Sequence, residues 1–319
     1  MRIVYCGCGE FGIDSLEAIK NSSHELVGII THPARPAGRG KKLRPTAVSQ
    51  WGADNGMGVY ELGDSNSDAG MAVLRELEPD LLVVIAFGQK ISQEFIAIAA
   101  KGAINVHASL LPKYRGAAPI NWAIINGEKQ TGISIITLAE KMDAGEILAQ
   151  ARLDIPASSR ASEVHDALAK LAGPVLVETI DKIAAGSAVY VKQDSSLASR
   201  APKLKKADGF LDWGLSATEL DNRIRGLWSW PGAQSDFVSA THGRCCRVMI
   251  AKSEVVSADD QGGKAGLLDE GLNVVCGHGR LKILEVKPQG KRLMDFKSFL
   301  NGRGGRAGDM FLSIEAGRS

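Results

Sequence analysis

The most chemically suggestive stretch of the chain is GAINVHASLLPKYRGAAPINWAI, residues 102–124. Asn105 and His107 lie two positions apart in an apolar run that predicts a strand, so their side chains project from the same face. Two prolines and a glycine follow in SLLPKYRGAAP, which ends the strand and predicts a rigid loop. Open α/β sheets bind ligands at the carboxyl ends of their strands, so this polar pair indicates a functional site.

A carboxylate for this site must come from elsewhere, because residues 95–127 contain no Asp or Glu. Asp143 lies in a Met-Asp-Ala-Gly turn between two predicted strands, where a short side chain can point across the sheet. Glu140 and Glu146 are the alternatives, but they flank the turn and are expected to face solvent. We therefore place Asp143 with the Asn-x-His pair.

These three side chains suit the transfer of a group between two bound substrates. Neither Ser nor Cys is placed to act as a nucleophile beside them, which argues against covalent catalysis. His and Asn can donate hydrogen bonds to an oxyanion, and loss of one such donor typically costs about a hundred- to a thousandfold in rate. The carboxylate can orient the imidazole or help to move a proton.

The elements that position these residues form a regular series in the N-terminal half. Short β-branched runs alternate with helical patterns, which predicts parallel βαβ units, and continuous apolar runs suit strands covered on both faces. The predicted strands are residues 2–6, 25–31, 80–87 and 102–108, with helices within 10–23 and near 46–55, 67–78 and 92–100. Residues 131–138 and 146–155 predict antiparallel edge strands, and a long helix then ends at Gly186.

The composition and periodicity of the sequence change after this helix. Residues 187–207 are polar, basic and weakly periodic, which is typical of a linker. Short strands broken by glycines follow, with one helix at about 216–227, and this pattern suits a small β-barrel or sandwich. We predict a domain over residues 1–186, a linker over 187–207 and a second domain over 208–319.

Residues 7–12, GCGEFG, have the glycine spacing of a dinucleotide-binding turn. That fingerprint expects an acid at the end of the second strand, but this strand runs into Thr31-His32-Pro33 and no acid appears until Asp54. Arg35 offers only a partner for a phosphorylated dinucleotide. We favour glycines that allow a tight strand-to-helix turn near the substrate, and a dehydrogenase is the less favoured alternative.

Bulk composition excludes several classes of protein. With 319 residues, 45% hydrophobic and 23% charged, the chain is neither fibrous nor disordered and is long enough for two domains. Its five unevenly spaced cysteines predict reduced thiols and no metal site. No apolar run reaches the roughly 18 residues of a membrane span, and no signal-peptide pattern begins the chain, so we expect a cytoplasmic protein without membrane contact.

The net charge of the chain is small, but the charged residues are unevenly distributed along the sequence. Residues 200–319 hold 19 Lys and Arg against 14 Asp and Glu, whereas residues 1–199 hold 19 against 22. Within the acidic N-terminal part, residues 31–53 contain five basic residues and no acid. Such a basic run on an acidic domain indicates contact with a polyanion.

The segment INVHASLLPKYRGAAP closely resembles the signature of the folate-dependent formyltransferases. THPARPAGRGKKLRP resembles a loop particular to the members that act on methionyl-tRNA. The resemblance implies an α/β architecture, with a Rossmann-like formyltransferase domain followed by a smaller C-terminal OB-like β-barrel domain that binds tRNA. The implied reaction transfers a formyl group from 10-formyltetrahydrofolate, the donor co-substrate, to the α-amino group of methionyl initiator tRNA for translation initiation.

The resemblance also implies roles for individual residues. The implied catalytic residues are Asn105, His107 and Asp143. The folate-binding positions are Ser109, Leu110, Leu111 and Pro112, and the positions that contact tRNA phosphates are Arg35, Arg39, Lys41 and Lys42. We expect a monomer that uses no metal ion.

Three departures from the family pattern are visible. Cys8-Gly9 in the opening turn and Ala108 after His107 affect backbone freedom rather than reacting groups. The third is the turn of residues 142–146, which keeps Asp143 but differs from the family at the residues beside it. Two alternatives remain beside the main prediction. One is a formyltransferase for a small amine or a formyltetrahydrofolate hydrolase, neither of which would need the basic run. The other is a tRNA-binding protein without activity, against which the retention of all three catalytic residues argues.

Overall fold

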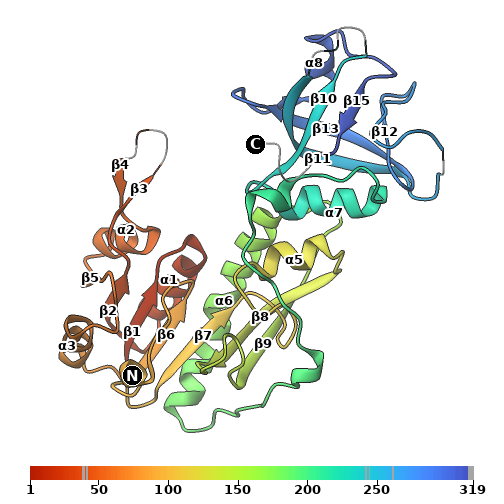
Figure 1. Ribbon diagram of the computed structural model, residues 1–319. Coiled ribbons are helices and arrows are strands. Elements are labelled where there is room, and N and C mark those ends of the chain that lie inside the picture. The colour runs from red at the N-terminus through yellow and green to blue at the C-terminus, as the bar shows by residue number, and fades with distance from the viewer. Residues whose placement is uncertain (38–39, 41, 241–242, 244, 261, 315–319) are drawn as a thin grey trace. The chain divides into compact units, whose positions relative to one another are not determined.

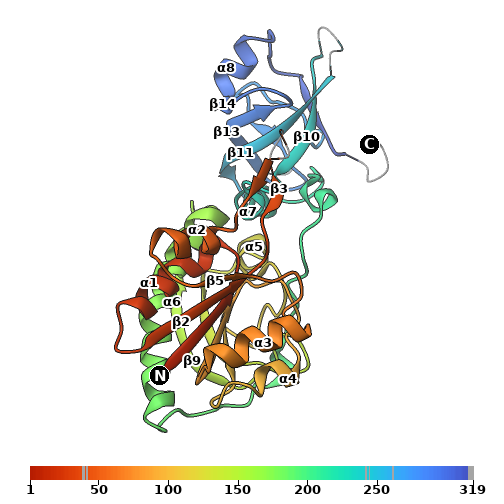
Figure 2. The same ribbon diagram turned by 90° about the vertical axis from the view of Figure 1, so that its left-hand side faces the viewer.

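The structure is a computed structural model that describes residues 1–37, 40, 42–240, 243, 245–260 and 262–314. The chain forms two compact units, each with its own sheet (Figures 1 and 2). The first unit consists of residues 1–116, 130–154 and 165–200, and the second of residues 117–129, 155–164 and 201–314.

A seven-stranded sheet forms the centre of the first unit, in the order β5-β2-β1-β6-β7-β8-β9. Its strands are β1 (Arg2–Gly7), β2 (Glu25–Thr31), β5 (Val59–Glu61), β6 (Leu81–Ile85), β7 (Ala103–His107), β8 (Gln130–Thr137) and β9 (Ile147–Asp154). The first five in that order are parallel, whereas β8 and β9 are antiparallel. The predicted Rossmann-like sheet and its two antiparallel strands are confirmed, but only β9 is an edge strand, because β8 pairs with both β7 and β9.

Helices cover both faces of this sheet (Figure 2). On one face are α1 (Ile13–Lys20), α2 (Ala47–Asp54) and α6 (Ala161–Ala184), and on the other are α3 (Asp68–Leu77) and α4 (Gln93–Ile96). Three of them begin at side chains that accept a hydrogen bond from the first helical turn, Thr46, Ser67 and Ser92. Because both faces are covered, the successive residues 3–6 of β1 are all fully buried, as the continuous apolar runs predicted.

A nearly closed antiparallel barrel forms the second unit. Its strands are β10 (Ala233–Val238), β11 (Cys245–Ser257), β12 (Val274–Val275), β13 (Arg280–Pro288), β14 (Met294–Asp295) and β15 (Met310–Leu312), in the order β12-β13-β11-β10-β15 with β14 beside β13. Leu267 pairs with Met310 and Leu268 pairs with Val274, so this short segment joins the two edge strands. The expected OB-like barrel is therefore confirmed as an antiparallel barrel.

Three helices accompany the barrel: α5 (Pro119–Ile125), α7 (Ala217–Leu227) and α8 (Phe296–Asn301). The sequence predicts α7, which begins at a capping box of Ser216 and Glu219. The sequence does not predict α5, because five of its seven residues are buried and it shows no amphipathic period.

None of the described helices combines the length and the apolar character that a membrane crossing requires.

Candidate active site

The site lies at the carboxyl end of β7, in the first unit. His107 is the last residue of this strand and is only 6% exposed, and Asn105, two residues earlier, is half-buried. In the antiparallel pairing with β8, His107 lies opposite Ser134. The strand alternation that the sequence predicted thus turns both polar side chains to one face.

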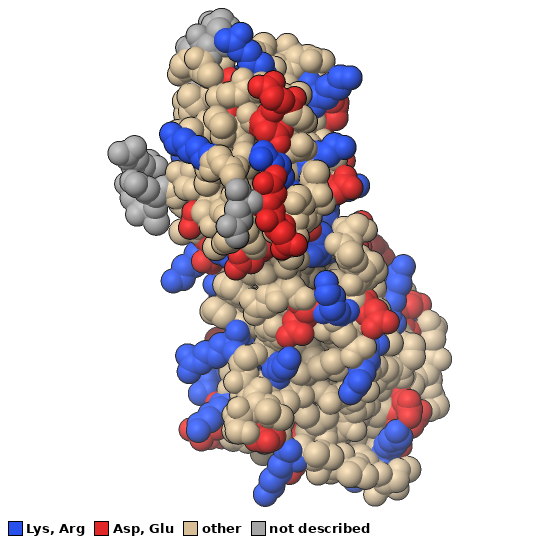
Figure 3. Space-filling model, turned by 90° about the vertical axis from the view of Figure 1, so that its right-hand side faces the viewer, with Lys and Arg blue, Asp and Glu red and all other residues tan. Residues whose placement is uncertain are grey.

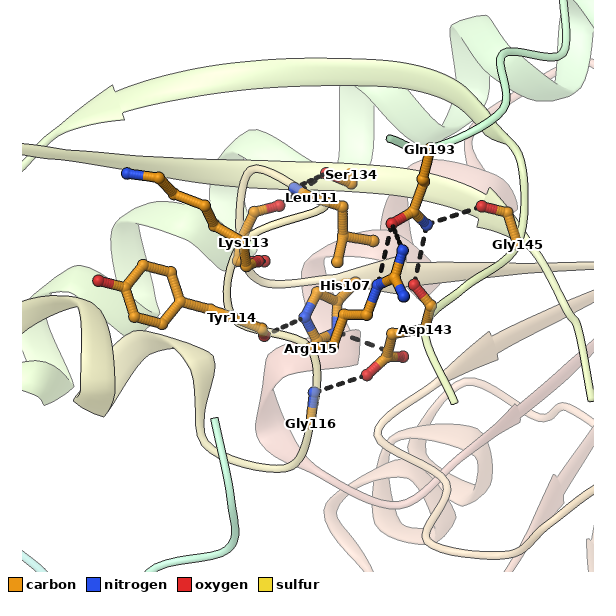
Figure 4. Close-up of polar contacts among 11 residues, drawn as sticks. His107, Leu111, Lys113, Tyr114, Arg115, Gly116, Ser134, Asp143, Gly145 and Gln193 are labelled. Atoms are coloured by element: carbon orange, nitrogen blue, oxygen red, sulfur yellow. Dashed lines mark hydrogen bonds and ion pairs between the residues drawn. The ribbon is translucent and has the colours of Figure 1, made fainter. Parts of the chain in front are cut away.

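Two contacts orient the His107 imidazole (Figure 4). Its Nε2 lies 2.9 Å from the main-chain carbonyl oxygen of Tyr114. A carbonyl oxygen only accepts, so Nε2 is the donor and carries a proton. Nδ1 then faces Asp143, whose Oδ1 lies 3.6 Å away, which is within ion-pair range but too long for a hydrogen bond.

Asp143 occupies the turn between β8 and β9 in a left-handed backbone conformation, with φ of +54°. Its Oδ2 accepts a hydrogen bond of 2.8 Å from the backbone N–H of Gly116. Gly145 closes the turn against the carbonyl of Thr137, where a Cβ atom would come within 1.7 Å of that oxygen. The side chains of Asp143 and His107 are only 13% and 7% exposed, so solvent screens their interaction little.

The loop that follows the strand is fixed by side chains from the neighbouring strands. The Ser134 hydroxyl donates to the carbonyl of Ser109 and accepts from the N–H of Leu111, at 2.7 and 3.0 Å. The amide of Gln150 donates to the carbonyl of Leu111 at 2.9 Å and to the Ser134 hydroxyl at 2.8 Å. Of the four predicted folate positions, Ser109 and Leu111 are buried, and Leu110 and Pro112 are half-buried.

The basic run forms a short hairpin after β2, where the sequence predicted a loop. Its strands are β3 (Arg35–Ala37) and β4 (Lys42–Arg44), and the Arg35 and Lys42 side chains are exposed. Arg39 and Lys41 lie outside the described residues. Nη2 of Arg35 lies 3.2 Å from Nδ1 of His32, and partial burial together with the Arg35 charge lowers the pKa of His32.

Two glycines of the opening motif lie against the Tyr5 side chain, which is fully buried. A Cβ at Gly12 would lie 1.7 Å from the Tyr5 hydroxyl, and one at Gly7 would lie 2.6 Å from the ring and 2.5 Å from the carbonyl of Ile85. Gly9 meets only the Cβ of Ala86, at an ordinary 3.6 Å. Two of the three glycines therefore make room for an aromatic ring.

Within the described part of the chain, no three His, Cys, Asp or Glu side chains gather as a group that could hold a metal ion.

Several residues around the site were not found from the sequence. Ser134 had a usable signal, because it is a polar residue inside an apolar strand, TGISIITL. Gln193, which bonds the Asp143 turn, and Arg115, which bonds Gln193, had none, because they lie far from Asp143 in the sequence.

Two family models match the chain. The model described as "Formyl transferase" matches residues 1–180, and "Formyl transferase, C-terminal domain" matches residues 203–304. A methionyl-tRNA formyltransferase of Moorella thermoacetica is 39% identical over 303 residues, covering 95% of this chain and 96% of the relative. That of Symbiobacterium thermophilum is also 39% identical, over 321 residues, covering 99% and 97%.

Solved structures support the same fold. An N-formyltransferase of Helicobacter canadensis, in complex with folinic acid and dTDP-3-aminofucose, matches with a TM-score of 0.62 at 16% identity, covering 88% of this chain and 98% of that one. HypX of Aquifex aeolicus, in complex with tetrahydrofolic acid, matches with a TM-score of 0.61 at 16% identity, covering 96% and 48%. With family models on both units and relatives along nearly the whole sequence, the chain belongs to the formyl transferase family.

Proposed function

We propose that this protein transfers a formyl group from 10-formyltetrahydrofolate to the α-amino group of methionine on initiator tRNA, in the cytoplasm, for translation initiation. The observation that carries the proposal is the identity of 39% to methionyl-tRNA formyltransferases, which extends through both units. The buried His107–Asp143 pair at the carboxyl end of β7 supports it, because this is where an α/β sheet binds its substrates.

In the proposed reaction, the lone pair of the uncharged amine attacks the formyl carbon and the bond from that carbon to the folate nitrogen breaks. A proton passes from the attacking amine to the leaving nitrogen. Asn105 is half-buried, and its side-chain amide makes no hydrogen bond within the described chain, so this amide is available to the developing oxyanion. His107 reaches the oxyanion only by exchanging one of its two protein contacts, and Asp143 holds the ring and helps to move the proton.

Folate binding is assigned to the loop of residues 109–112. Ser109 donates its hydroxyl proton to the carbonyl of Lys113 at 2.7 Å, and Leu111 is buried, so these two residues support the loop from within. Leu110 and Pro112 are half-buried and offer apolar surface to a flat ring. We propose that this surface contacts the pterin of the donor.

A labelled formyl donor tests the proposed function directly. The protein is incubated with labelled 10-formyltetrahydrofolate and charged initiator methionyl-tRNA, with charged elongator methionyl-tRNA, a nucleotide-linked amino sugar and free methionine as competing acceptors. We expect the label on initiator methionyl-tRNA. Transfer to the sugar amine, or release of free formate without any acceptor, would contradict the proposal.

The β3–β4 hairpin is proposed to contact tRNA phosphates through Arg35, Arg39, Lys41 and Lys42. The barrel is proposed to add a second, less specific RNA surface. Two of its arginines pair with acids, Arg247 with Asp236 and Arg280 with Asp260 and Asp269. On the face shown in Figure 3, basic and acidic side chains are interspersed. Residues 35–44 hold five basic residues and no acid, so this basic run is the more concentrated positive feature of the sequence.

Replacing Arg39, Lys41 and Lys42 together by Gln should weaken tRNA binding and reduce its dependence on salt. Each lost phosphate contact removes about 0.7 to 0.9 from the slope of log affinity against log salt concentration, so the slope should fall by about two. The measurement is tRNA affinity at several salt concentrations. A control variant replaces the exposed Lys101, Lys170 and Lys182 by Gln, and an equal slope change there would refute a specific role for the hairpin.

A further inference from the structure

Gln193 contacts the Asp143 turn from a distant part of the chain. It lies in the segment that follows α6, and its Nε2 donates to the carbonyl of Asp143 at 2.8 Å and to the carbonyl of Gly145 at 2.7 Å (Figure 4). Its Oε1 accepts from Nε and Nη2 of Arg115, at 3.1 and 2.7 Å. Both amide protons and the amide oxygen of this side chain are therefore used at one place.

The segment that carries Gln193 is itself fixed to the first unit on both sides. Val191 pairs with Ile147 of β9 through two backbone hydrogen bonds of 2.8 and 2.9 Å. Further along, Ser199 accepts from the backbone N–H groups of Tyr114 and Arg115, both at 2.9 Å. The residues around Gln193 are exposed, whereas Gln193 itself is half-buried.

These contacts form a closed ring around Asp143. Gln193 binds the backbone carbonyl of Asp143, and Arg115 binds Gln193. The next residue, Gly116, donates its N–H to the Asp143 carboxylate. Gln193 therefore holds the backbone of Asp143 and Gly116 holds its carboxylate, and Arg115 links the two because it bonds Gln193 and precedes Gly116 in the chain.

Asp143 needs such support because its backbone is left-handed, a conformation that residues other than glycine adopt only at a cost in conformational energy. Strained backbone persists where the surroundings over-determine it. A turn released from Gln193 would relax, and the carboxylate, already 3.6 Å from the imidazole, would move relative to His107.

We propose that Gln193 and Arg115 are positioning residues for formyl transfer, which act as one brace that sets the Asp143 carboxylate against His107. The proposal rests on the proposed function for its catalytic readout. It extends the functional site into a segment that, on its sequence, is typical of a linker.

The first test replaces Gln193 by Leu, which keeps the size of the side chain and removes its donors and acceptor. Because small displacements of a reacting group cost up to about a hundredfold, we expect kcat to fall about ten- to a hundredfold, with KM for both substrates within about twofold of wild type. Gln193→Glu keeps the acceptor for Arg115 but cannot donate to the two carbonyls when ionised, so it should not restore kcat. Gln130→Leu is the control, because Gln130 bonds Asp154 at the far end of β9.

The second test reports on geometry without any turnover. Imidazole nitrogen resonances of His107, assigned with a His107→Asn variant, should shift in Gln193→Leu and stay unchanged in Gln130→Leu. The melting temperatures of the two variants are compared in the same samples. An unchanged His107 resonance with wild-type kcat in Gln193→Leu would overturn the proposal, and so would a shift and a loss of equal size in Gln130→Leu.

A double-mutant cycle tests whether the two residues act together. If Gln193 and Arg115 act as one brace, the double variant Gln193→Leu/Arg115→Leu lowers kcat no further than the worse single variant. Independent, multiplicative losses would contradict the brace. If the wild type does not formylate methionyl-tRNA, the proposed function fails, whereas the His107 resonances still decide whether Gln193 sets the site geometry.

Discussion

Asp143→Asn should lower kcat for formyl transfer by at least about a hundredfold, the lower end of what a positioned group contributes to proton transfer. Asn has the same size and keeps an oxygen that can accept from the N–H of Gly116. It lacks the negative charge that lies 3.6 Å from Nδ1 of His107, where both side chains have little exposure to solvent. The measurement is kcat at saturating donor and methionyl-tRNA.

His107→Ala belongs to the same prediction and should be at least as damaging, because it removes the imidazole that Asp143 and the Tyr114 carbonyl hold in place. Folate binding is measured separately, so that a loss of the chemical step is distinguished from a loss of the donor. Asp154→Asn, on the exposed end of β9, is the matched control and should leave kcat unchanged. Near-native turnover in either site variant would remove that residue from the mechanism.

Gly12→Ala should destabilise the first unit more than any comparable glycine substitution in the opening turn. Its Cβ would lie 1.7 Å from the hydroxyl of Tyr5, whose side chain is fully buried. The backbone at Gly12 has φ of −88°, which any residue adopts, so the cost comes from the contact alone. Forced overpacking costs about 1 to 3 kcal/mol or more, and we expect the upper end, with Tm lower by about 10 °C.

Gly9→Ala is the control for this prediction, because its Cβ meets only Ala86 at 3.6 Å. Tyr5→Phe adds a second check. Within the described residues the buried Tyr5 hydroxyl has no hydrogen-bond partner, so its removal should not reduce the free energy of unfolding. It should also recover part of the loss in Gly12→Ala. Equal Tm values for Gly12→Ala and Gly9→Ala would show that the glycines serve another purpose.

This packing role revises the interpretation of the glycine motif. From the sequence, the three glycines were expected to give a tight turn near the substrate. The structure shows that Gly7 and Gly12 make room for the Tyr5 ring, while Gly9 has ordinary space. Spacing alone cannot distinguish a glycine that admits a ligand from one that admits a neighbouring side chain, since both remove the same Cβ.

Much of the fold was predictable because its signals are local. The apolar runs of β1, β2, β6 and β7 and the caps of the covering helices lie within a few residues of the elements they specify. Where the local signal was weak, prediction failed. The segment at 92–100 contains only the short α4, and α5 has no amphipathic period because most of it is buried.

The sequence by itself predicted which residues form the candidate site. Strand alternation placed Asn105 and His107 on one face, and the turn between β8 and β9 carries Asp143, which lies 3.6 Å from His107. Only the tertiary structure decided which contacts hold the loop and the Asp143 turn in place around these side chains. Ser134 reaches the 109–112 loop from a neighbouring strand, and Gln193 reaches Asp143 from a segment fifty residues further along the chain. Such contacts depend on the path of the folded backbone, and no local periodicity encodes that path.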